Sequence, residues 1–201
     1  GTVTQGEELS ASVSDADGTS GVTISYQWNR DGNAISDATT STYTLVQADV
    51  GAEITATASY SDQLGTGESP TSAATSSIAN VNDTGSVSVS GTVTQGQELS
   101  ANVSDADGTS AVTINYQWNR DGIAISDATT STYTLLQADV GAEIAVVASY
   151  TDEFGSTESH TSGATSSVAN LNDAGSVVVS GTATQGEELS ASVSDADGIS
   201  G

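Results

Sequence analysis

The sequence predicts an all-β protein built of antiparallel β-sandwiches, and three observations support this prediction. The chain repeats itself, since the segment that starts at Gly1 recurs at Gly91 and Gly181, with about 20 of 90 positions changed between the first two copies. Within each copy, short stretches alternate apolar with polar residues, as half-buried strands do. No stretch has the apolar spacing of a helix.

The repeat length indicates how the chain divides into domains. Self-similarity at a fixed period marks an array of like units. A period near 90 residues suits a small domain with its own core better than a solenoid coil. We therefore expect a first repeat at 1–83 without its first strand, a complete second repeat at 84–173 and the start of a third at 174–201. Tandem near-copies are typical of a spacer, a stalk or a multivalent binder.

The complete repeat should contain seven or so short strands, separated by turn signals roughly every 8–12 residues. The expected strands are 87–90, 99–103, 112–118, 124–126, 132–135, 144–150 and 157–168. The clearest is 112–118, where Val112, Ile114, Tyr116 and Trp118 alternate with polar residues.

Local signals mark the turns between these strands. Asp121-Gly122 tolerates the positive φ that a hairpin turn needs. The segment 137–141, Gln-Ala-Asp-Val-Gly, predicts a tight turn with a single helical turn in it. The loops Asp-Ala-Asp-Gly at 105–108 and Asp-Glu-Phe-Gly at 152–155 end two strands, and 170–173 leads into the next copy.

Trp118 points to the immunoglobulin-like class of β-sandwich. It lies in the third strand and should face the strand that follows the Asp-Val-Gly turn, as in immunoglobulin domains. The disulfide that usually accompanies this residue is missing, because the chain has no cysteine. We interpret Trp28 and Trp118 as core residues rather than platforms for a sugar, because each alternates in phase with apolar neighbours.

The charge and the residue inventory argue against several classes of function. The 26 acidic residues face only Arg30 and Arg120, which gives a formal net charge of −24. Such a surface repels phosphate backbones and anionic membranes, so we expect neither nucleic-acid binding nor membrane insertion. His160 is the one histidine and Pro70 is its counterpart, so no nucleophile–base set recurs and we expect no enzyme.

An ordered string of residues in the first repeat resembles a known type of repeat. It reads Tyr-Gln-Trp-Asn-Arg-Asp-Gly at 26–32, Ala-Thr at 38–39, Ser-Thr-Tyr-Thr-Leu at 41–45, Ala-Asp-Val-Gly at 48–51 and Ser-Tyr-Ser-Asp at 59–62. This string resembles the immunoglobulin-like tandem repeats of giant bacterial surface proteins, which include RTX-type adhesins exported by type I secretion and biofilm-associated proteins. The linker Asn-Val-Asn-Asp at 80–83 is also similar, and the resemblance covers essentially the whole chain.

The resemblance implies an extracellular role at the bacterial cell surface. In such proteins the repeats are extender modules that hold a terminal adhesive domain away from the cell, and each repeat has the neighbouring repeats of its own chain as partners. Many related repeats bind calcium at the junctions between domains, which stiffens the stalk. The sequence contains none of the glycine-rich nonapeptides of the RTX calcium β-roll, so type I secretion depends on the resemblance.

Acidic and amide side chains from three places in each repeat should meet at the end of the sandwich where the linker enters. Carboxylate, amide and carbonyl oxygens are the ligands of Ca²⁺, which takes about six to eight of them. The expected ligands are Asn82, Asp83, Asp105, Asp107 and Asp152 for the second repeat, Asn172, Asp173, Asp195 and Asp197 for the third, and Asp15, Asp17 and Asp62 for the first. The alternative is that these residues only form turns, because Asp readily hydrogen-bonds its own backbone.

Two other functions stay open beside the stalk. In an extracellular filament or matrix, the two strands expected in 175–201 would complete a neighbouring sandwich by strand donation. In a binding module, the loop tips would recognise a glycan or a protein surface. The binding module is the weaker alternative, because the loops change little between copies and exposed aromatic residues are not evident.

Overall fold

The computed structural model describes residues 2–198, and the contacts within it divide the chain into two compact units. The first unit ends at Asp83 and the second begins at Thr84. Within 2–198, the two short 3₁₀ turns η1 (Gln47–Asp49) and η2 (Gln137–Asp139) are the only helical elements. In the same range, no helix is long and apolar enough to cross a membrane.

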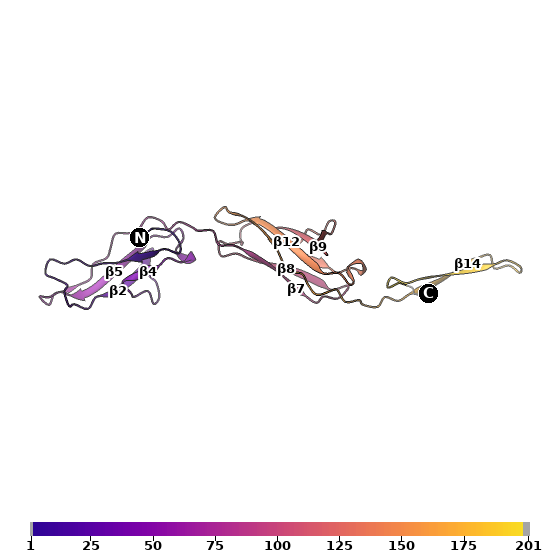
Figure 1. Ribbon diagram of the computed structural model, residues 1–201, viewed down its shortest axis with the longest axis horizontal. Helices are drawn as coiled ribbons and strands as arrows, with labels where there is room; N and C mark the ends of the chain where they lie inside the picture. The colour runs from indigo at the N-terminus through magenta and orange to yellow at the C-terminus, as the bar shows by residue number, and fades with distance from the viewer. Residues whose placement is uncertain (1, 199–201) are drawn as a thin grey trace. The chain divides into compact units, whose positions relative to one another are not determined.

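The second unit contains an antiparallel β-sandwich. One sheet has the strand order β10 (Ile123–Ala124), β9 (Asn115–Arg120), β12 (Ile144–Thr151), β13 (Thr157–Thr161). The other has the order β11 (Thr132–Thr134), β8 (Glu98–Ser104), β7 (Ser86–Gly91). Figure 1 shows β9 and β12 in one layer and β7 and β8 in the other. The predicted fold class, an all-β immunoglobulin-like sandwich, is confirmed.

The first unit follows the same plan within residues 2–83. Its larger sheet has the order β3 (Asn33–Ala34), β2 (Ser25–Arg30), β5 (Ile54–Ser61), β6 (Gly67–Glu68), and β1 (Glu8–Ser10) pairs with β4 (Thr42–Thr44). In the third copy, β14 (Ser176–Gly181) and β15 (Leu189–Ser194) form a hairpin. This hairpin repeats the register of β7 and β8, with Val177 opposite Val193 as Val87 is opposite Val103.

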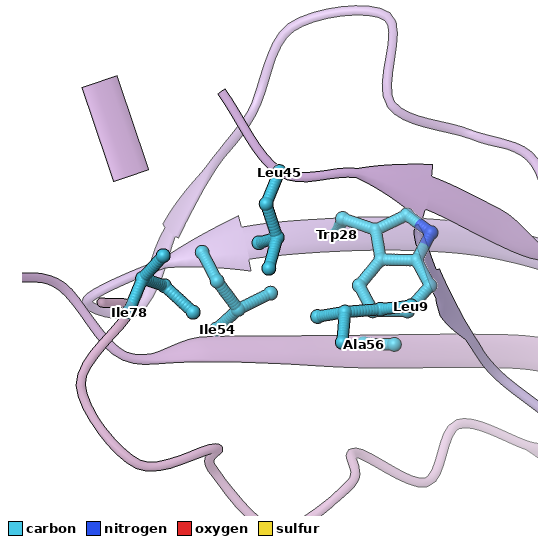
Figure 2. Packing of buried hydrophobic residues seen from close by; sticks show 6 residues of the cluster. All are labelled: Leu9, Trp28, Leu45, Ile54, Ala56 and Ile78. Carbon is cyan, nitrogen blue, oxygen red and sulfur yellow. The ribbon is translucent and has the colours of Figure 1, made fainter. Parts of the chain in front are cut away.

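A tryptophan lies in the core of each unit. Figure 2 shows the buried cluster of the first unit, which consists of Leu9, Trp28, Leu45, Ile54, Ala56 and Ile78. Trp28 is 3% exposed, and its indole N–H donates a hydrogen bond to the carbonyl of Thr40 at 2.9 Å, so burial leaves no polar atom unpaired. Trp118 is 0% exposed and donates in the same way to Thr130. The prediction that both tryptophans are core residues is confirmed.

One predicted strand begins later than expected. The alternating run 112–118 becomes a strand only from Asn115. The preceding loop is bound to Glu153 instead of pairing with a strand. The Glu153 carboxylate accepts hydrogen bonds from the backbone N–H groups of Ser110 and Ala111 and from the Ser110 hydroxyl, at 3.0, 3.3 and 2.6 Å. The residues just before the strand therefore belong to a loop tied to the 152–155 turn.

Another predicted strand is shorter than expected. The polar run 157–168 is a strand only as far as Thr161. Beyond that point, the hydroxyl oxygens of Ser162 and Thr165 accept hydrogen bonds from the backbone N–H groups of Val146 and Ile144, each at 3.0 Å. Side chains thus replace part of the backbone ladder, which a Ser/Thr-rich pattern does not reveal.

A buried aspartate ties the two sheets of each unit together. Asp139 is 0% exposed, and its Oδ1 accepts hydrogen bonds from Arg120 Nε at 2.7 Å and pairs with Nη2 at 2.5 Å. Its Oδ2 accepts from the Tyr133 hydroxyl at 2.8 Å and from the Leu136 backbone N–H at 2.7 Å. Arg120 belongs to β9 and Tyr133 to β11, so one carboxylate joins a strand from each sheet. The same arrangement recurs 90 residues earlier around Asp49.

We predict that Asp139→Ala destabilises the second unit by about 3 kcal/mol, because it leaves a charged guanidinium, a hydroxyl and an amide without their shared acceptor. Urea unfolding followed by Trp fluorescence measures this. The control is Glu143→Ala at an exposed site of the same repeat, which should change the free energy of unfolding by less than about 0.5 kcal/mol. Equal losses in the two variants would contradict a stabilising role for the buried pair.

Candidate metal sites

Three carboxylates converge near one end of the sandwich in each unit. In the second unit they belong to Asp105, Asp152 and Glu158, and one carboxylate oxygen from each lies within 4.8 Å of the others. The first unit brings Asp15, Asp62 and Glu68 together within the same limit. These are the metal-compatible clusters of three or more His, Cys, Asp or Glu side chains in residues 2–198.

The strand register explains why these three residues meet. Asp105 directly follows β8, and Asp152 directly follows β12. Glu158 lies on β13 directly opposite Tyr150 of β12. Because opposite residues of an antiparallel pair point to the same face, Glu158 faces the side where Tyr150 is buried.

Hydrogen bonds orient two of the carboxylates in the second unit. Asp105 Oδ2 accepts from the Tyr150 hydroxyl at 2.7 Å, and its Oδ1 accepts from the Asp107 backbone N–H at 2.9 Å. Asp152 Oδ1 accepts from the backbone N–H groups of Phe154 and Ser156, each at 2.9 Å. Asp152 Oδ2 is buried and has no hydrogen-bond partner.

Glu158 differs from its counterpart in the first unit. It is 7% exposed, whereas Glu68 is exposed. The Glu158 carboxylate lies 2.5 Å from Nε2 of His160, and Pro70 occupies the matching position in the first unit. The third member of the second cluster is therefore the more enclosed and more strongly oriented of the two.

The linker carboxylates are held by glutamine side chains of their own units. Gln5 donates from Nε2 to Asp83 Oδ2 at 2.7 Å and accepts at Oε1 from the Val81 backbone N–H at 3.2 Å. Gln95 makes the same two bonds, at the same distances, to Asp173 and Leu171. These hydrogen bonds, which we call the glutamine clasp of each unit, join residues 76 or 78 positions apart and fix the linker to the sandwich that precedes it.

Within the second unit, the structure brings together three of the residues predicted for the junction to the third copy. The Asp173 backbone N–H donates to Asp197 Oδ2 at 2.8 Å, and the Asp197 N–H donates to Asp195 Oδ1 at 2.9 Å. Asp197 Oδ1 is buried without a hydrogen-bond partner. Asn172 is exposed, and its side chain donates to the carbonyl of Asp173 at 3.2 Å.

The other predicted ligands have varied environments. Asp107 is 1% exposed, whereas Asp17, its counterpart in the first unit, is exposed. Asn82 is also exposed. Glu68 and Glu158 belong to the clusters although they are not among the residues predicted as ligands, because their sequence context indicates only a polar strand. Each glutamate lies opposite a tyrosine of the neighbouring strand, Glu68 opposite Tyr60 and Glu158 opposite Tyr150, and this register is not visible in the sequence pattern.

Two tyrosine hydroxyls lie against these clusters with raised pKa values. The hydrogen bond from Tyr60 to Asp15, at 2.8 Å, raises the pKa of Tyr60 to about 12. In return, hydrogen bonds from the Asp17 backbone N–H and from Tyr60 lower the pKa of Asp15. Burial, followed by the hydrogen bond to Asp105, raises the pKa of Tyr150. Each hydroxyl therefore remains a proton donor to a carboxylate at neutral pH.

No family model and no curated protein matches the chain. Among solved structures, three N-terminal domains of the bacteriophage RB49 highly immunogenic outer capsid protein (Hoc) are similar, with 17% identity, a TM-score of 0.32, and coverage of 98% of this chain and 68% of that one. Fibronectin(III)-like modules of CbhA from Clostridium thermocellum are also 17% identical, with a TM-score of 0.27 and coverage of 83% and 87%. The fold assignment depends on the strand order of each unit and not on these similarities.

The raised tyrosine pKa values predict a loss of stability in alkali. Tyr60 has a pKa of about 12, as does Tyr133, whose pKa is raised by burial and then by its hydrogen bond to Asp139. A pKa raised in the folded state adds stability that is fully present below about pH 10 and is lost as pH rises towards about 12, because the unfolded chain deprotonates first. We expect the urea-derived free energy of unfolding to fall across that window.

The double variant Tyr60→Phe/Tyr133→Phe tests this assignment. It should start from a lower stability at neutral pH, because each change removes a hydrogen bond to a carboxylate. Between about pH 10 and about pH 12, its free energy of unfolding should fall less steeply than that of the unsubstituted chain. An equally steep fall would show that other groups cause the alkaline loss.

Proposed function

We propose that this chain consists of extender repeats from a large secreted bacterial surface protein of the adhesin type. The observation that carries the proposal is that one buried architecture recurs 90 residues apart. Leu9, Trp28, Leu45 and Ile54 form the core of the first unit, and Leu99, Trp118, Leu135 and Ile144 form that of the second. An array whose units each bury their own core gains length by adding copies and needs no change within a copy.

The clasped linkers support a role that depends on stiffness. A free linker of a few residues would let successive domains swing independently. Here Gln5 and Gln95 hold the carboxylates of Asp83 and Asp173 and the preceding backbone, so the last residues of each linker are fixed to the sandwich behind them. Fewer linker residues then remain free to bend, which suits a spacer that holds another domain at a fixed distance.

Calcium at the junctions is the second part of the proposal. At the junction that follows the second sandwich, Asp173 and Asp195 both contact Asp197, whose Oδ1 is buried without a hydrogen-bond partner. Oxygen-rich loops of this kind are the usual environment of Ca²⁺. A cation there would neutralise part of an acidic surface in a chain with a net charge of −24. The junction would then be more rigid with calcium than without it.

Placement at the cell surface depends on the resemblance of the repeats to those of bacterial adhesins. The composition is compatible with it, because a high net charge keeps a long repetitive protein soluble. The chain also has no cysteine, so its folding does not depend on a redox environment. The proposed partners are neighbouring repeats of the same chain.

Small-angle X-ray scattering with calcium and with EGTA tests this proposal. The maximum dimension of the chain should increase with calcium and the profile should become more rod-like. The double variant Asp173→Asn/Asp197→Asn should lose this response at the second junction. The matched control Glu187→Gln/Glu188→Gln removes two exposed charges from the third copy and should respond as the unsubstituted chain does.

Superimposable profiles with and without calcium would refute the junction sites, and the acidic loops would then be ordinary turns. A concentration series in the same experiment addresses the filament alternative. Growth of the apparent mass with concentration would indicate self-association, whereas a stalk repeat should keep a constant mass.

A further inference from the structure

We propose that Asp105, Asp152 and Glu158 form a second kind of cation site, contained within one repeat, that binds a hard divalent cation with Ca²⁺ as the preferred ion. The site would join the end of β8 to the strands β12 and β13. It takes Asp105 and Asp152 from the junction set expected for the second repeat, replaces the linker residues of that set with Glu158, and shares no ligand with the junction that follows the second sandwich. Its effect would be on the stability of the repeat itself.

The first argument is the unsatisfied oxygen of Asp152. This side chain is 4% exposed, and two backbone N–H groups of its own turn hold Oδ1 in place. The other oxygen, Oδ2, is buried and accepts no hydrogen bond. A buried carboxylate oxygen without a partner is costly. A cation among the three carboxylates would supply the missing interaction.

The second argument is the shortage of positive charge. Three carboxylates lie within 4.8 Å of one another, and the chain has no lysine and only two arginines. Arg120 is committed to Asp139 and Arg30 to Asp49. Two titratable side chains from outside the cluster contact its members: the Tyr150 hydroxyl donates to Asp105, and His160 bonds Glu158. A bound dication would offset much of the negative charge of the three carboxylates.

The donor set indicates the class of ion. All three members offer carboxylate oxygens, which suit Ca²⁺ and Mg²⁺ rather than metals that prefer sulfur or nitrogen. Asp105 and Asp152 each follow the end of a strand, and Glu158 lies within a strand, so the ligands come from three separate elements. Ca²⁺ accepts a flexible geometry and a variable number of ligands, with water completing the shell, whereas Mg²⁺ demands a near-ideal octahedron.

The test is calorimetric titration of the full chain with CaCl₂ after treatment with EDTA, using Glu158→Gln and the control Glu143→Gln. Both variants lose one negative charge in the same repeat, but Glu143 is exposed and lies outside the cluster. Glu158→Gln should weaken one calcium site by about tenfold or more, because a carboxylate ligand becomes a neutral amide. The control should titrate as the unsubstituted chain does.

Thermal unfolding separates a ligand role from a merely structural one. In EDTA, Glu158→Gln should be at least as stable as the unsubstituted chain, because it relieves repulsion among the three carboxylates. In calcium it should be less stable, because it gains less from binding. A variant that is destabilised equally in both buffers would overturn the inference, as would an unsubstituted chain that binds no calcium at millimolar concentration.

The junction variant Asp173→Asn/Asp197→Asn distinguishes this site from the proposed function. If the Glu158-dependent binding persists in that variant, the site within the repeat stands, whatever the scattering experiment shows. If Glu158→Gln binds calcium like the unsubstituted chain while the junction variant loses binding, the inference fails and the junction sites stand. A parallel titration with MgCl₂ that binds more tightly than CaCl₂ would overturn the choice of ion.

Discussion

Each repeat depends on one buried ion pair. Asp49 and Asp139 are fully buried, and each receives an arginine, a tyrosine hydroxyl and a backbone N–H from different parts of its sandwich. The pair joins the strand that carries the core tryptophan to the opposite sheet. The tyrosine that bonds the carboxylate also stacks on that tryptophan, with ring centroids 5.7 and 5.8 Å apart in the two units. In a domain without disulfides, this cross-link between the sheets takes over part of the role of a covalent bond.

The same ion pairs shape the electrostatics of the whole chain. Once Arg30 and Arg120 are paired inside, histidine is the only basic side chain left to offset the other carboxylates. The surface is therefore strongly acidic, and three carboxylates lie close together near the strand ends of each unit. This distribution is the physical basis of the dication binding that we propose.

The two units show which features vary while the architecture persists. Gln63 of the first unit is replaced by Glu153 in the second, and both residues tie the loop before β2 or β9 to the turn after β5 or β12. They do so through different atoms, because the Gln63 amide donates to the carbonyl of Ser20, whereas the Glu153 carboxylate accepts from Ser110. Pro70 becomes His160, which orients Glu158. The changes concentrate at the end of the sandwich that carries the acidic clusters, so the repeats differ most in their electrostatic details there.

The sequence alone determined the repeat, the all-β class, the core tryptophans and most strand positions, because periodicity and turn chemistry are local and act within a few residues. Only the tertiary structure decided which carboxylates meet. Glu158 joins Asp105 and Asp152 because the register of β12 and β13 places it opposite Tyr150. Gln95 reaches Asp173 across 78 positions because the fold returns the chain to its starting end. Such contacts depend on strand register and topology, which short-range patterns do not encode.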